Sequence, residues 1–492
     1  MTLPSYDPPT SHRPAPPAAG AEPPPERPRR APAVTAAAVV LLLGGAGVAA
    51  GSWLAGGGTQ PQDVLPADTL GVLSLDLDPS ASQKLALMTL LDKFPDLGTE
   101  GDGDIRGHLL QPLLDETDTG LDYAADIRPW LGDRMAVAAV PDEGSEEGVL
   151  PVVVLAVTDP ELMAENLEDA RARTDFGFAV RDGFVLVTDS QDHADDLAAA
   201  EDVLADDADF AGDRRALGDD QVALAWADLS AVERIAAAQG APPVAPGELF
   251  GGEHLTGRVI LGVHAQDDAL ELVGLDFSVS DTGVPSSEPT SLVHGLPEDA
   301  LAALSVSGVG ERAVQAWAEL ERTGGAEALG VPPELGLDLP DDLRTLLGTD
   351  LAVAAFGDVD EPRFGARVAT EEPGEAVRLL DVVLDDPQLG LPVVHDTVDG
   401  GYVVAGDEAA LDLLARADGG LGDSEAFRAA VADPDEAGAI GYVDLAAVVE
   451  QLVDRGGETA EQAARFGAVE ALGFSATSTD EGGRFVLRIT TR

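Results

Sequence analysis

The chain has 492 residues, of which 45% are hydrophobic, so it is long enough for two or three domains with sizeable cores. Its 29 Lys and Arg residues against 90 Asp and Glu residues give a formal net charge of −61, which repels phosphate backbones and argues against nucleic acid as a partner. The absence of cysteine excludes disulfides, thiolate zinc sites, iron–sulfur clusters and cysteine nucleophiles.

The N-terminal part of the sequence predicts a membrane anchor. Residues 1–33 are rich in proline and almost free of large apolar side chains, so we expect a disordered tail. Residues 34–55 are uncharged and apolar, and as a helix they would span about 33 Å, enough to cross the hydrocarbon core of a membrane. We therefore predict a transmembrane helix over residues 34–55, through which the protein contacts the membrane.

The charges beside this segment predict its orientation. Arg27, Arg29 and Arg30 come directly before it, so the positive-inside rule places the tail in the cytoplasm and the C-terminal domains outside the cell membrane. A cleavable secretory signal is the alternative, because Val48 and Ala50 suit the −3 and −1 positions of a cut. The long proline-rich leader and the length of the apolar run favour the single-pass anchor.

An internal repeat organises the remaining chain after a short linker over residues 56–63. We expect one copy over residues 64–283 and a second over residues 292–492, both extracytoplasmic. The pattern LPxDxLxxLS opens at Leu65 in the first copy and at Leu296 in the second.

Two further matches support the repeat. The segment that begins at Trp130 resembles the one at Leu346, and the segment that begins at Ala225 resembles the one at Gly441. Both pairs are separated by the same 216 positions, so coincidence is a poor explanation. The change from Trp130 to Leu346 indicates that this position serves packing.

The elements expected within each copy predict an α+β fold with mixed, largely antiparallel sheets. Hairpin turns are expected at Asp182-Gly183 and at Asp399-Gly400, since such turns need positive φ angles. In chain order the first copy is expected to contain a strand after its LPxD opening, a helix from about residue 81, strands over 135–140 and 152–157, a helix starting within 158–161, the hairpin around 182, a helix over 191–200 and a terminal hairpin over 257–279. The second copy is expected to contain counterparts, with strands over 351–356 and 363–369, a helix from about 373, a helix over 407–417 and a terminal hairpin over 469–490.

Several features of the sequence together point to a known family: the LPxD opening after an apolar helix, the WLGD element at residues 130–133, the TDPE helix start at 158–161, and the WADL and YVDL elements near Asp228 and Asp444. With these features the sequence resembles the membrane-anchored domain-of-unknown-function 3352 family of high-GC Gram-positive bacteria. The resemblance extends over about residues 64–492. It implies an extracytoplasmic α+β protein behind an N-terminal anchor. The family has no agreed activity, so the resemblance implies no site residues.

Three motifs could carry chemistry, and each either has an ordinary explanation or lacks a required residue. Residues 308–313 have the outline GxGxxA of a dinucleotide-binding loop, but no second parallel strand ending in an acid follows, so a tight strand-to-helix turn is expected. Asp76 and Asp78 form a D-x-D pair that could bind a divalent cation, although solvent is the ordinary partner of such residues. The acids of residues 100–104 resemble a calcium loop, but Ile105 stands where its glycine is required.

Asp228 and Asp444 are acids present in both copies, and each is expected to cap a helix that follows a strand. Residues 230–233 could add a capping box to the first of these helices. The histidines show no HxH, HxxxH or HExxH spacing, and no GxSxG or SxxK motif occurs. We therefore predict no catalytic, cofactor-binding or metal-binding residues and no cofactor.

These observations favour a non-enzymatic module that binds an envelope protein, polymer or small ligand between its two copies. The alternative is an envelope hydrolase in which the fold brings two carboxyl groups together. The abundance of acidic residues is the observation that suggests it. The proline-rich tail could also dock on a cytoplasmic domain with an aromatic-lined groove, although a spacer explains its composition as well.

Overall fold

The computed structural model describes residues 58–77, 80–94, 106–107, 110–111, 114, 120–145, 148–218, 221–238, 257–277, 288–323, 337–384, 393–416, 420–456, 463, 465–479 and 482–492. The predicted tail and transmembrane helix lie outside these residues. None of the helices in the described part of the chain is long and apolar enough to cross a membrane.

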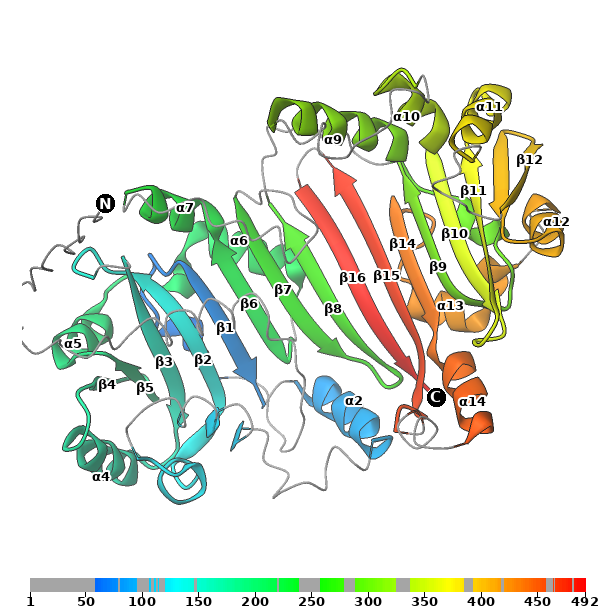
Figure 1. Ribbon diagram of the computed structural model, residues 1–492. Helices are drawn as coiled ribbons and strands as arrows, with labels where there is room; N and C mark the ends of the chain where they lie inside the picture. The colour runs from blue at the N-terminus through cyan, green and yellow to red at the C-terminus, as the bar shows by residue number, and fades with distance from the viewer. Residues whose placement is uncertain are drawn as a thin grey trace, which may run out of the picture.

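All strands of the described residues belong to one antiparallel sheet of 16 strands (Figure 1). Its order is β12-β13-β11-β10-β9-β14-β15-β16-β8-β7-β6-β1-β2-β3-β5-β4. The strands are β1 (Gly71–Asp76), β2 (Leu131–Pro141), β3 (Val149–Val157), β4 (Gly177–Arg181), β5 (Phe184–Thr188), β6 (Ala223–Asp228), β7 (Arg258–Ala265), β8 (Ala269–Asp276), β9 (Ala300–Ser307), β10 (Asp350–Gly357), β11 (Pro362–Ala369), β12 (Val394–Val398), β13 (Gly401–Ala405), β14 (Ala439–Asp444), β15 (Val469–Thr479) and β16 (Gly482–Thr491). The predicted α+β class with antiparallel pairing is confirmed.

Helices connect these strands and lie on both faces of the sheet. The α-helices are α2 (Ala81–Asp92), α4 (Pro160–Arg171), α5 (Gln191–Ala199), α6 (Ala208–Leu217), α7 (Leu229–Ala238), α9 (Val309–Thr323), α10 (Asp341–Leu347), α11 (Pro373–Leu384), α12 (Glu408–Arg416), α13 (Glu425–Ala430) and α14 (Leu445–Arg455). Short helical turns are η1 (Pro61–Asp63), η3 (Tyr123–Ile127), η4 (Leu204–Asp206), η5 (Leu292–Gly295) and η8 (Leu421–Asp423).

The sheet contains the same strand order twice, running inward from its two ends. From one end the order is β4-β5-β3-β2-β1-β6-β7-β8, and from the other it is β12-β13-β11-β10-β9-β14-β15-β16. The two series meet where β8 pairs antiparallel with β16, with Val273 opposite Val486. We call this pairing the seam. The division of the chain into two domains stays a prediction, because the strands form one uninterrupted sheet.

The LPxD openings form short turns, and the strands that follow begin later than expected, at Gly71 and Ala300. Leu65 and Leu296 are fully buried, and their carbonyl oxygens accept hydrogen bonds from the backbone amides that start η4 and η8. The leucines of this pattern therefore anchor corresponding turns in the two series.

Helices on one face of the sheet enclose two large apolar clusters. We call it the helix-covered face. Phe210 of α6 packs at 5.5 Å and 87° against Trp226 of β6. Phe427 of α13 packs at 5.4 Å and 66° against Tyr442 of β14. The same aromatic pair therefore occupies corresponding positions in the two cores.

The opposite face is covered near its ends. Trp130 is fully buried in a cluster with Met163 and Leu167 of α4, so the expected packing role of this tryptophan is confirmed. Helix α2 covers part of β7, and α11 covers β11 and β13 at the other end. The central strands of this face lie between these covered ends.

Local signals in the sequence predicted several helix starts and turns correctly. Asp159 caps α4 by accepting a hydrogen bond from Leu162, and Pro160 is the first helical residue. Asp182 has φ 46° and Gly183 has φ 87°, as the predicted β4–β5 hairpin requires.

Side chains form hydrogen bonds with backbone groups at both outer edges of the sheet. The Gln191 amide donates to the Phe178 carbonyl and accepts from the Phe178 amide, at 3.0 and 3.4 Å. At the other edge the Asp396 carboxylate accepts from the Thr397 amide at 2.8 Å. These bonds block groups that could otherwise pair with a further strand.

Candidate functional site

The GxGxxA segment forms the expected tight turn between β9 and α9. Gly308 has φ 66°, and its amide donates to the Thr349 carbonyl. The Gly310 amide donates to the Gly348 carbonyl, and a Cβ at Gly310 would lie 2.6 Å from that oxygen. Gly308 therefore provides the positive φ of the turn, Gly310 allows close packing against the end of α10, and both amides already have backbone partners.

Asp76 takes part in an ion pair. Its carboxylate lies 3.0 Å from Arg134 Nε and accepts a hydrogen bond from Gln60 at 3.0 Å. The expectation that solvent is its ordinary partner is wrong, because Arg134 points at it from the neighbouring strand. Asp78 and the acids of residues 100–104 lie outside the described residues.

Asp228 and Asp444 are helix caps, as predicted. Asp228 accepts from the Ala231 amide at 2.9 Å, and Asp444 accepts from the Ala447 amide at 2.8 Å. The capping box proposed for residues 230–233 is replaced by a different contact, since Ser230 Oγ accepts from the Gly257 amide at 2.9 Å.

Three of the histidines face one carboxylate each. His193 Nδ1 lies 2.7 Å from Asp189, His395 Nε2 lies 3.0 Å from Asp381, and His294 Nε2 lies 3.4 Å from Asp435. The Asp189 carboxylate raises the pKa of His193 mainly through this hydrogen bond. Within the described ranges, no three His, Asp or Glu side chains are grouped so that they could hold a metal ion. His12, His108 and His254 lie outside those ranges.

A polar pocket opens beside the seam on the helix-covered face, with a volume of about 630 Å³. We call it the seam pocket. Its lining comes from η5, η8, α13, the loop after α13 and β16: His294, Gly422, Asp423, Arg428, Val431, Ala432, Asp433, Pro434, Asp435, Glu436 and Arg488. Because Ala432 also belongs to the apolar cluster of the first strand series, the loop after α13 reaches across the seam.

Ion pairs hold both arginines of the pocket in place. Arg488 Nε lies 2.9 Å from Glu271 of β8, so this pair bridges the seam, and Arg488 also donates to the Ala429 carbonyl. Arg428 forms an ion pair with Asp423. Four acids against two arginines leave the lining negative, so the pocket favours a ligand with positive charge.

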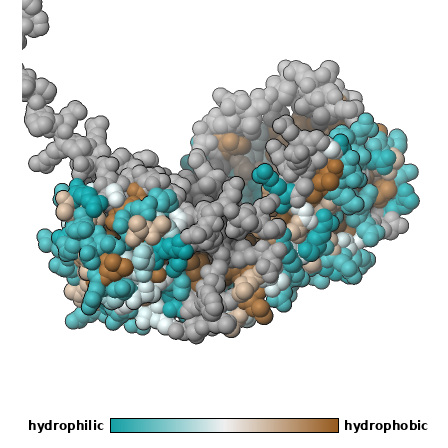
Figure 2. Space-filling model, turned by 90° about the horizontal axis from the view of Figure 1, so that it is seen from below, coloured by the Kyte–Doolittle hydropathy of each residue, from teal (hydrophilic) through white to brown (hydrophobic). Residues whose placement is uncertain are grey.

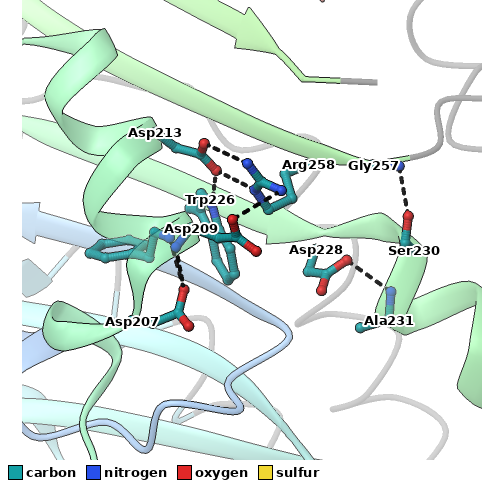
Figure 3. A network of polar contacts seen from close by, with 10 residues as sticks. Asp207, Asp209, Asp213, Trp226, Asp228, Ser230, Ala231, Gly257 and Arg258 are labelled. Atoms are coloured by element: carbon teal, nitrogen blue, oxygen red, sulfur yellow. Dashed lines mark hydrogen bonds and ion pairs between the residues drawn. The ribbon is translucent and has the colours of Figure 1, made fainter. Parts of the chain in front are cut away.

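A buried polar network lies between α6 and the strands β6 and β7 (Figure 3). Asp213, whose side chain is 3% exposed, lies 2.7 Å from Arg258 Nε and 3.0 Å from Arg258 Nη2. It also accepts from Trp226 Nε1 at 2.9 Å. Asp209 contacts the same guanidinium at 3.5 Å, and these carboxylates raise the pKa of Arg258.

Sequence reasoning missed this network, because Asp213 and Arg258 are separated by β6 and α7. In the second series, Ala471 of β15 occupies the position that Arg258 has in β7, because each lies opposite the aspartate that ends the neighbouring strand. The 216-position spacing of the repeat makes the buried Ala430 of α13 a near equivalent of Asp213. The first series therefore has a buried ion pair where the second series has apolar residues. Each of its three polar groups is satisfied within the network, which indicates a structural role.

Asp350 is a partly buried acid at the start of β10. Burial raises the pKa of its carboxyl, the nearby negative charge of Glu288 acts in the same direction, and hydrogen bonds with Thr349 and Thr290 oppose both. It does not belong to the lining of the seam pocket. The structure therefore does not bring this protonatable acid and the seam pocket together.

Residues 34–178 match the family model described as protein of unknown function (DUF3352). This part of the chain is similar to the DUF3352 family. The match begins at the first residue of the predicted transmembrane helix and ends in β4, whereas the resemblance was expected over residues 64–492. No curated protein matches the chain at a significant level. The description of this family model gives no activity, and the geometry of the described residues is the remaining evidence for a function.

Proposed function

We propose that this protein is a non-enzymatic binding module of the cell envelope, with the seam pocket as its ligand site. Residues 34–55 would anchor it in the cell membrane with the N-terminal tail in the cytoplasm. The observation that carries the proposal is the position of a polar pocket beside the pairing of β8 with β16, where the two strand series meet.

The membrane anchor is supported by the sequence. The apolar run of residues 34–55 is uncharged, three arginines precede it, and the family match begins at Val34. The described surface seen from below is mostly hydrophilic, with few and scattered hydrophobic residues (Figure 2). Such a surface suits an acidic module in water outside the membrane.

A duplicated domain is part of the proposal, with copies over residues 64–283 and 292–492. It is supported by the repeated strand order, by the matching contacts of Leu65 and Leu296, and by the matching caps at Asp228 and Asp444. The equivalent strands β8 and β16 pair antiparallel, as they would in a two-fold symmetric dimer.

The chemistry of the seam pocket favours a ligand that carries ammonium groups. Asp423 and Asp435 already face Arg428 and His294, whereas no ion pair is found for Asp433 or Glu436 among the described residues. Amino sugars and lysine-containing peptides of the envelope combine such groups with hydroxyl or amide groups, and the polar lining could bind both.

Binding of glucosamine oligomers and lysine-containing peptides to the full chain in nanodiscs tests this proposal. We expect the double variant Asp433→Asn with Glu436→Gln to weaken binding at least about tenfold, because it removes two negative charges and keeps the side-chain shapes. The matched control, Asp267→Asn with Asp268→Asn in the β7–β8 turn, removes the same charge away from the pocket.

Equal weakening by the two double variants would indicate attraction by the overall charge and would contradict a specific seam pocket. Failure of the unmodified chain to bind either probe would contradict the proposed ligand class. Protease treatment of intact cells tests the topology separately: we expect the sheet to be cleaved, and protection until the cells are opened would refute an external location.

The alternative function is an envelope hydrolase, and Asp350 is the observation that favours it. A general acid needs a raised pKa, and burial raises that of Asp350. Glu288 would be the second carboxyl group. Loss of a polymer-cleaving activity in Asp350→Asn, with unchanged stability, would support the hydrolase. We favour the binding module because the seam pocket and Asp350 are separate.

A further inference from the structure

The middle of the sheet has a broad apolar surface on the face opposite α6 and α13. We call it the central apolar face and define it by Leu73, Leu261, Leu304, Phe474, Phe485 and Leu487. Leu304 is 50% exposed and the other five are half-buried. Residues opposite each other in a ladder point to the same face, so the strand register determines which side chains gather here.

Two rows of paired residues build this face across the seam. One row runs from Leu73 through Ala225, Leu261 and Gly274 to Phe485. The next row runs from Leu272 to Leu487, Phe474, Gly441 and Leu304. Both rows therefore join side chains of the two strand series.

Glycines and aromatic rings shape the centre of the face. A Cβ at Gly274 would lie 2.1 Å from the Phe485 ring, so this ring lies over the glycine. The Phe485 and Phe474 rings are 6.4 Å apart and tilted by 30°. Together they form an aromatic pair beside the seam.

The described helices leave this region open. On the same face α4 packs near one end, α11 packs near the other, and α2 covers part of β7. In Figure 1 the central strands β7, β8, β16 and β15 face the viewer, while α2, α7, α9 and α14 lie around their ends. None of the six defining residues belongs to a buried cluster of the described chain.

The six defining residues of the face offer an occupant no hydrogen bonds. Its defining side chains have no polar atoms, and the backbone of each central strand pairs with a strand on both sides. A protein partner would ordinarily make about one hydrogen bond per 100–200 Å² of interface. An occupant without hydrogen-bonding groups is therefore the complementary one.

Charge leads to the same conclusion. The chain carries −61, yet the six defining side chains are uncharged. A second copy brought face to face would place two strongly negative molecules within a Debye length, about 8 Å at physiological salt. Repulsion disfavours that arrangement, whereas a neutral aliphatic chain meets no such cost. A contiguous, partly exposed apolar surface of this kind indicates a binding site.

We propose that the central apolar face binds the hydrocarbon chain of a lipid. This site lies on the opposite side of the sheet from the seam pocket, so it is a second ligand site and does not depend on the proposed function. Proximity to the membrane through residues 34–55 would supply such lipids.

Photo-crosslinking of a diazirine-labelled fatty acid to the full chain in nanodiscs tests the site. Peptide mapping should find the label on β7, β9, β15 or β16. We expect Leu304→Lys to reduce this labelling at least about tenfold, because it places a charge where the chain would lie, and Leu304 is exposed enough for the fold to tolerate lysine. Leu85→Lys on α2, where Leu85 is 64% exposed, is the matched control.

Label confined to residues 34–55 would show only contact with the surrounding bilayer and would overturn the proposal. Absence of label, as expected if another part of the chain or a second copy occupies the face, would also overturn it. So would equal labelling of the Leu304→Lys and Leu85→Lys variants. Binding of ammonium ligands in the seam pocket should be the same in all three proteins, so failure here is distinguishable from failure of the proposed function.

Discussion

Replacement of Asp213 by alanine would remove the shared acceptor of the buried network. Arg258 would lose two hydrogen bonds and Trp226 Nε1 would lose one. Breaking a fully buried ion pair costs about 3–5 kcal/mol. Because the Arg258 side chain is 27% exposed, water can replace part of its lost contacts, and we expect a decrease of about 2–3 kcal/mol in the free energy of unfolding.

Urea denaturation of the full chain, followed by circular dichroism, measures this change. Asp209→Ala is the matched control, since Asp209 contacts the same guanidinium at 3.5 Å but is 66% exposed, and its loss should cost less than about 1 kcal/mol. The double variant Asp213→Ala with Arg258→Ala should be more stable than Asp213→Ala alone, because it leaves no unpaired charge. Equal stability of the Asp213 and Asp209 variants would refute the reasoning.

Three further changes test separate parts of the structure. Gly473→Ala should destabilise the protein, because the new Cβ would lie 2.1 Å from a carbonyl oxygen of α13. The control Gly212→Ala in α6 meets nothing within 4 Å and should stabilise the protein by about 0.5–1 kcal/mol. Thermal unfolding that ranks the two variants the other way would contradict the packing. Asp444→Ala should cost about 1 kcal/mol in urea denaturation, since the cap of α14 is lost, and an unchanged midpoint would argue against the cap. Burial raises the pKa of Asp350, so ionisation of its carboxyl lowers the stability of the fold as the pH rises above the unfolded pKa. Asp350→Asn should therefore raise the free energy of unfolding at pH 7 and flatten its pH dependence above about pH 4. A decrease in the free energy of unfolding at pH 7 would contradict this reasoning.

Local features of the fold could be predicted from the sequence because their causes are local. The Asp182-Gly183 turn, the Asp159 cap and the Asp444 cap each depend on residues within a few positions of one another. The repeat was also visible, because it needs only a comparison of the chain with itself.

Features that depend on which strands pair could not be predicted. Asp213 and Arg258 meet only because α6 packs over β6 and β7, and neither residue lies in a recognisable motif. The ion pair between Arg488 and Glu271 joins residues 217 positions apart. Both the seam pocket and the central apolar face arise from the pairing of β8 with β16. Neither strand has a sequence feature that predicts which strand it pairs with.

A single engineered disulfide tests that pairing most directly. Leu272 of β8 lies opposite Leu487 of β16, and directly opposed strand residues have Cα atoms about 4.5–5.5 Å apart, which suits a disulfide. Because the chain has no cysteine, cysteines at these two positions can pair only with each other within one molecule. Mild oxidation should give a cross-linked monomer in high yield, detected by its changed mobility on a non-reducing gel. Free thiols after oxidation, in a chain that remains folded, would contradict the continuous sheet and both binding sites with it.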